Sequence, residues 1–126
     1  MTELHASPNM RKMIAEINLA YQPDFVLMDG IEVFVDGGPD QGTRKKGNVM
    51  LLSRDRVALD AVGVAILKDL GSNKAIMSTP VFQQEQILRA VELGLGVSNP
   101  ENIEIISDDA DGERYGQRLH AVLLAK

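Results

Sequence analysis

The stretch from Asp24 to Asp60 constrains the fold most, because its apolar runs enclose a glycine-rich loop and then lead into a helix start. The runs at 25–28, 31–35 and 49–52 are rich in Val, Ile, Leu, Phe and Met and are bounded by Asp, Gly, Pro and Asn. This pattern is typical of buried strands. We therefore expect any ligand-binding part of the chain to lie within this stretch.

The dipeptide Asp29-Gly30 divides the first apolar segment and allows two interpretations. Asp-Gly is a strong signal for a two-residue hairpin turn, which would join residues 25–28 to residues 31–35. It is equally compatible with the end of a parallel strand, where an Asp side chain faces the crevice in which α/β sheets bind ligands. The two interpretations do not exclude each other, since a turn Asp can also point into a site.

The loop at 36–48, DGGPDQGTRKKGN, contains four glycines and a proline, so we expect it to interrupt the strands. Its backbone amides can form an anion-binding nest with basic side chains beside it. Its glycine spacing matches neither a P-loop nor a dinucleotide-binding fingerprint, and the alternative is a mobile loop with a solvated basic face. The candidate anion site consists of Gly37, Gly38, Pro39, Gly42, Arg44 and Lys45, with Lys46 next to it.

Two aspartates at the following helix start have both a structural and a functional interpretation. After a strand at 49–53, Asp55 is expected to cap a helix that runs to about Leu70, with a glycine at its C-cap. Asp60 can pair with Arg56 one turn earlier. However, Asp60 also lies in an otherwise apolar stretch, and a half-buried carboxylate there requires a partner or a function.

The rest of the chain predicts supporting elements around this centre. We expect helices at 8–20, from Pro80 to about Gly94 and at 113–124, together with a short strand at 103–106. The predicted architecture is one α/β domain over residues 1–126, with a small mixed sheet of three or four strands covered by about four helices.

Composition excludes several classes of function. A net charge of −5 argues against non-specific nucleic-acid binding, which depends on many contacts from Lys and Arg to phosphate. The absence of cysteine excludes disulfides and an iron–sulfur cluster ligated by this chain. No signal peptide or long apolar run is present, so we expect a cytoplasmic protein that does not enter a membrane. No catalytic constellation can be assembled, and enzymatic activity is left open.

Residues from His5 to Gly96 resemble the C-terminal half of the domain of unknown function 362 family, which often occurs next to ferredoxin-type [4Fe-4S] modules. The matching segments are MIAEIN, PDFVLMDGI, GGPDQG, LLSRDRVALDAVG, ELGLG and NIEIIS. The resemblance implies that the chain is the C-terminal half of a larger family domain. Any [4Fe-4S] cluster would belong to a separate module or partner.

The resemblance also implies a shared ligand site. Its matched positions are Asp29, Gly30, Gly38, Pro39, Gly42, Ser53, Asp55 and Asp60. We expect a small anionic ligand at the glycine loop, a divalent cation held by Asp29, Asp55 and Asp60, or both. The alternative is a non-catalytic interaction module that docks an iron–sulfur electron-transfer partner, with self-association covering exposed core.

Overall fold

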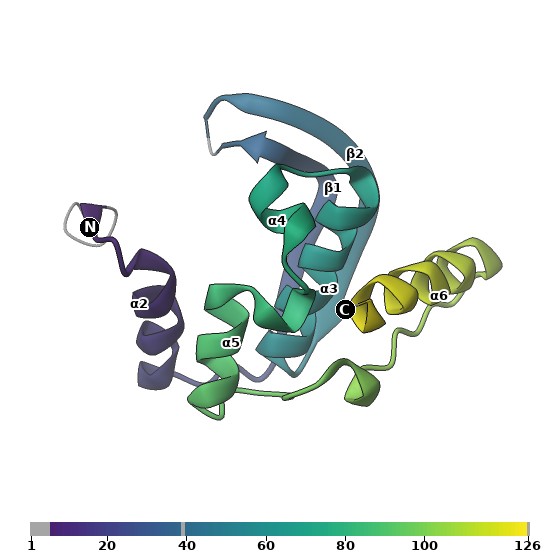
Figure 1. Ribbon diagram of the computed structural model, residues 1–126. Coiled ribbons are helices and arrows are strands. Elements are labelled where there is room, and N and C mark those ends of the chain that lie inside the picture. Colours follow the sequence, from purple (N-terminus) through teal and green to yellow (C-terminus); the bar gives the residue numbers. More distant parts are fainter. Residues whose placement is uncertain (1–5, 39, 126) are drawn as a thin grey trace.

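The computed structural model describes residues 6–38 and 40–125, which form a mixed α/β fold built on one long hairpin (Figure 1). The strands are β1 (Val26–Gly37) and β2 (Gly42–Ser53), and the helices are α2 (Met10–Ile17), α3 (Arg56–Leu70), α4 (Lys74–Ser78), α5 (Glu85–Glu92) and α6 (Ala110–Leu124). Four helices confirm the helical segments predicted from sequence, whereas α4 was not predicted. Across the described ranges, no helix combines the length and hydropathy needed to cross a membrane.

The sheet is smaller than the sequence predicts. β1 pairs antiparallel with β2, from Val26 opposite Ser53 to Gly37 opposite Gly42, and these two strands make up the whole sheet in the described part of the chain. The expectation of three or four strands is therefore wrong. Residues 103–106, predicted as a strand, line a hollow together with the end of β2 but form no ladder with it.

Asp29-Gly30 forms neither a turn nor a strand end, because β1 continues through both residues. The pairing register shifts just after Gly30, and Asn48 on the facing strand adopts a positive φ of 54° at this irregularity. Gly30 is buried, and a side chain at Gly47 would overlap the Gly30 carbonyl oxygen. The lack of a side chain at Gly47 thus permits the two strands to approach closely at a bulge. The prediction of a turn at Asp29-Gly30 is wrong.

The basic run at 44–46 belongs to β2, which corrects the expectation that the whole of 36–48 interrupts the strands. Only residues 38–41 lie between the paired strands. A two-stranded ribbon exposes one face, so long charged side chains fit there without leaving the ladder. Arg44 pairs with Glu32 at 3.0 Å and lies over the ring of Phe34, while Lys45 Nζ donates to the Leu70 carbonyl at 2.5 Å.

α3 is the centre of the fold, since it contacts both strands and also α4, α5 and α6. It begins after the predicted cap Asp55 and ends at the predicted C-cap Gly71, which has a φ of 77°. Gly63 lets the helix approach the Met28 side chain closely, because a Cβ atom there would lie 3.0 Å from the sulfur. The buried core around α3 comprises Val57, Ala61, Val62, Ala65, Ile66, Val81, Ile87, Ile103, Leu119 and Leu123.

Lys68, in the last turn of α3, holds the short helix α4 in place. Its ammonium group donates to the carbonyl oxygens of Ile76 at 3.1 Å, Met77 at 3.2 Å and Thr79 at 2.7 Å. These carbonyls lie at and just beyond the C-terminal end of α4, where carbonyl oxygens have no partner within the helix. Burial lowers the pKa of Lys68.

Candidate functional site

Asp60 lines an open cavity of about 190 Å³ bordered by α2, α3, α5 and the base of the hairpin. Three further polar side chains, Asn18, Arg56 and Gln86, contribute to its lining. The rest of the wall is apolar and includes side chains such as Met28 and Ile87. A mainly apolar hollow with a few polar groups is typical of small-ligand sites.

The Asp60 carboxyl group is half-buried, and this burial raises its pKa. Within residues 6–38 and 40–125, no hydrogen bond or ion pair reaches it. A carboxylate in such surroundings loses hydration without receiving donors in exchange, which costs free energy. Its oxygen atoms are therefore available to a hydrogen-bond donor that enters the cavity.

Arg56 lies one helical turn before Asp60, but it does not form the ion pair expected from the sequence. Its Nη1 donates to the carbonyl oxygens of Asn18 at 2.7 Å and Tyr21 at 2.9 Å, and its Nε donates to that of Leu95 at 3.4 Å. The guanidinium also lies over the Tyr21 ring, 5.8 Å from the centroid. Arg56 thus ties the segments before β1 and after α5 to α3 and shapes the cavity wall.

Ser53 and Asp55 form a hydrogen-bonded junction between β2, α3 and the segment after α5. Ser53 Oγ accepts from the Asp55 amide at 3.0 Å. Asp55 Oδ1 accepts from the Ala58 amide at 2.8 Å, and Oδ2 accepts from the Val97 amide at 2.7 Å. A side chain at Gly96 would overlap the Asp55 carboxylate. Both oxygen atoms of the predicted cap therefore have backbone partners, which gives Asp55 a structural role. Ligand binding by Ser53 and Asp55 stays a prediction.

Asp29 lies on the other face of the hairpin. Its neighbours Met28 and Gly30 are turned toward α3, whereas Asp29 is exposed and its Oδ1 accepts from the Ile31 amide at 2.9 Å. The described residues contain no group of three His, Asp or Glu side chains that could hold a metal ion. The structure does not bring Asp29, Asp55 and Asp60 together, and metal binding by them stays a prediction that this geometry does not support.

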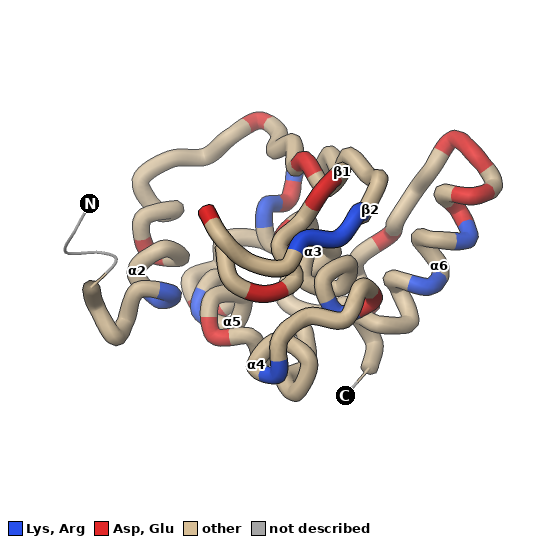
Figure 2. Tube along the Cα trace, turned by 90° about the horizontal axis from the view of Figure 1, so that it is seen from above, with Lys and Arg blue, Asp and Glu red and all other residues tan. Residues whose placement is uncertain are grey.

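The glycine loop lies at the opposite end of the hairpin from Asp60. At about 3.3 Å per residue, the ladder from Val26 to Gly37 separates the two by roughly 35 Å of strand. Gly37 and Gly38 have φ values of 76° and 86°, and the Gly38 amide donates to the Gln41 carbonyl oxygen at 2.6 Å. Pro39 lies outside the described residues. Figure 2 shows the adjoining basic run as one segment of β2.

The glycines of this loop have a conformational reason to be there, because positive φ angles strain other residues. The neighbouring basic side chains Arg44 and Lys45 already have the partners described above. Anion binding at the loop stays a prediction.

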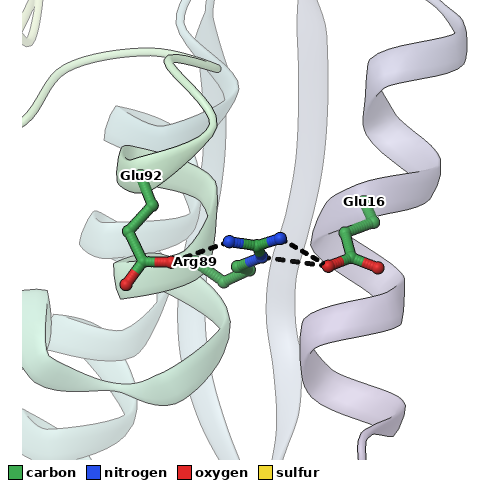
Figure 3. A network of polar contacts seen from close by, with 3 residues as sticks. All are labelled: Glu16, Arg89 and Glu92. Carbon is green, nitrogen blue, oxygen red and sulfur yellow. Dashed lines mark hydrogen bonds and ion pairs between the residues drawn. The ribbon is translucent and has the colours of Figure 1, made fainter.

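An ion-pair network holds α2 against α5 at the edge of the cavity (Figure 3). Arg89 donates through Nη2 and Nε to one oxygen of Glu16, at 2.7 and 3.0 Å, and through Nη1 to Glu92 at 2.9 Å. Ala15, next to Glu16, is buried and lines the cavity. The sequence predicted neither this network nor the hydrogen bonds of Arg56, because both join residues that are far apart in the sequence.

A family model described as Domain of unknown function (DUF362) matches residues 1–65. The matched range includes α2, the hairpin, the Ser53 and Asp55 junction and Asp60 on α3, whereas the segments ELGLG and NIEIIS lie outside it. Neither a curated protein nor a solved structure gave a match.

Proposed function

The chain belongs to the family described as Domain of unknown function (DUF362), and from that premise we propose that it binds a small ligand in the cavity at Asp60. One observation carries the proposal: the half-buried Asp60 carboxyl group has no hydrogen-bond partner among the described residues and lines a cavity with apolar walls. Asp29 and Asp55 accept from backbone amides, so local structure explains them. Among the acidic residues that the structure describes within the matched range, Asp60 is the half-buried one without such an explanation.

The chemistry of the cavity favours a ligand that combines a small apolar body with an amine or another hydrogen-bond donor. An ammonium group beside Asp60 would restore the electrostatic stabilisation that burial removes. The side-chain amides of Asn18 and Gln86 can orient further polar atoms of the ligand. The apolar wall around Met28 and Ile87 would take up the remainder.

The two ligands expected from the sequence, a divalent cation and an anion at the glycine loop, have less support. A divalent cation prefers six or more oxygen ligands, and Asp60 is the one carboxylate among the residues that line this cavity. An anion at the glycine loop would have to compete with the Glu32 carboxylate for Arg44.

A second candidate function is an interaction module that docks an iron–sulfur electron-transfer partner. The observation in its favour is an exposed apolar face on the hairpin, formed by side chains such as Leu27 and Leu52. The cluster would belong to the partner, because this chain has no cysteine. We also propose that the chain is the C-terminal half of a larger family domain and that it is located in the cytoplasm.

Probes that share one apolar body and differ in their head group test the cavity. We would titrate n-butylammonium, n-butanol and butyrate into ¹⁵N-labelled protein and follow amide chemical shifts. The ammonium probe should produce saturable shifts around Asp60 and Gln86. Butyrate should not, because its charge has the same sign as the carboxylate and the Arg56 guanidinium is already bonded to three carbonyl oxygens. Asp60→Asn should abolish the preference for ammonium over butanol.

Asp29→Asn is the matched control, because it removes an equal charge from an exposed position outside the cavity. It should leave the probe preferences unchanged. Titration of the wild type and Asp29→Asn with Mg²⁺, Mn²⁺ and Ca²⁺ tests the metal hypothesis in the same assay. Equal shifts with butyrate and butylammonium, or an unchanged preference in Asp60→Asn, would refute the proposed site.

A further inference from the structure

The hairpin face turned away from α3 exposes several large apolar side chains. Five of them, each between 52% and 67% exposed, form what we call the outer patch: Phe25, Leu27, Ile31, Met50 and Leu52. Ile106, on the segment that borders the end of β2, is 80% exposed and extends the patch. Exposed apolar groups of this extent mark interaction surfaces.

Strand pairing explains why these side chains gather. Leu27 lies opposite Leu52 in the ladder, and Met50 lies opposite Asp29. Because side chains alternate between the faces of a strand, the residues between them, such as Met28 and Leu51, point to the α3 side instead. The helix α3 therefore covers one face of the hairpin (Figure 1), and the outer patch occupies the other.

We propose that the outer patch binds the same patch of a second copy of this chain, forming a twofold-symmetric dimer. Six side chains exposed to this degree offer about 600 Å² of apolar surface per copy, at roughly 100 Å² each. With the adjoining backbone and polar rim, the area approaches the ~800 Å² that each partner contributes to a standard stable interface.

A second copy fits the chemistry of the patch better than a charged partner does. The residues that define the outer patch are all uncharged, and the neighbouring Asp29 carboxylate already accepts from the Ile31 amide. A net charge of −5 disfavours an anionic membrane surface as the occupant. Two hairpins packed face to face would form a two-layer sandwich. This packing would also stabilise a two-stranded ribbon, which α3 covers on one face.

The oligomeric state of the full chain tests the proposal. Sedimentation velocity should give a species of twice the 13.8 kDa chain mass in the wild type. Leu52→Lys should convert it to the monomer, with at least a tenfold increase in dissociation constant, because an isologous contact places the new charge in the interface twice. Leu27→Lys should act in the same direction. Both positions are exposed in the single chain, so circular dichroism should show an unchanged fold.

Leu19→Lys is the matched control, since Leu19 is 59% exposed on the 3₁₀ turn Asn18–Ala20, away from the hairpin. It should remain dimeric. Mixing Leu52→Lys with Leu52→Glu protein should restore a heterodimer through opposite charges. A wild type that is monomeric throughout, or a dimer that persists unchanged in both patch variants, would overturn the proposal.

Discussion

Replacement of Asp60 by asparagine should stabilise the domain, although it removes the group on which the proposed ligand site depends. Asparagine keeps the shape of the side chain but carries no charge to desolvate. Removing a half-buried carboxylate that lacks a described partner should raise the free energy of unfolding at neutral pH by about 1 to 2 kcal/mol. For a domain of this length the midpoint of thermal unfolding should rise by about 3 to 8 °C.

The difference in unfolding free energy between Asp60→Asn and the wild type should depend on pH, and this dependence identifies its cause. Burial raises the pKa of Asp60 in the folded state, so the folded protein binds the proton more tightly than the unfolded chain. The wild type should therefore gain stability relative to Asp60→Asn as the pH falls from neutral through the raised pKa toward 3.8, the ordinary pKa of an aspartate. The advantage of the variant should shrink over this range and vanish below it.

Urea unfolding followed by circular dichroism, at a series of pH values, measures the difference directly. Other carboxylates titrate in both proteins and largely cancel when the two curves are subtracted. Asp29→Asn, the exposed control, should shift stability by less than about 0.5 kcal/mol. A destabilised Asp60→Asn protein would show that Asp60 has a stabilising partner. A difference that does not change with pH would show that folding leaves the pKa of Asp60 unchanged, and either result would refute the reasoning.

Three further substitutions test the junctions around the cavity. Asp55→Asn should cost about 2 kcal/mol of unfolding free energy, because an amide replaces one of two oxygens that accept from the Ala58 and Val97 amides; chemical denaturation checks this. Gly96→Ala should lower the thermal midpoint by displacing the Asp55 carboxylate, and an unchanged midpoint would contradict the close contact. Arg89→Met should lower the thermal midpoint only slightly in dilute buffer and not at all in concentrated salt, because salt screens ion pairs at the surface. Calorimetry at two salt concentrations measures both midpoints.

The helices were predictable because their signals are local. Asp55 before an apolar stripe and Gly71 after it define the limits of α3, and the structure places both caps where the sequence indicates. The hairpin was harder to predict. Asp29-Gly30 has the composition of a turn, but the bulge at Gly30 depends on contact with Gly47 in another strand. Tertiary contacts of this kind overrode the local signal.

The candidate site was predictable only in part, for the same reason. A lone acidic residue in an apolar stretch correctly marked Asp60 as half-buried. Its neighbours in the cavity, Asn18 and Gln86, come from two other helices and carry no signal in their own segments. The expected gathering of Asp29 and Asp55 around Asp60 depended on a parallel sheet, and the antiparallel hairpin turns Asp29 to the opposite face.

The hydrogen bonds from Lys68 to α4 and Thr79 affect the reactivity of its amine. All three protons of the ammonium group are donated to carbonyl oxygens, so the nitrogen must give up hydrogen bonds to α4 and Thr79 before it can react with an acylating reagent. Lys74, exposed on the same short helix, has no such protection. In a mass-spectrometric time course, the ratio of acylation at the two lysines would report how often this corner of the molecule opens.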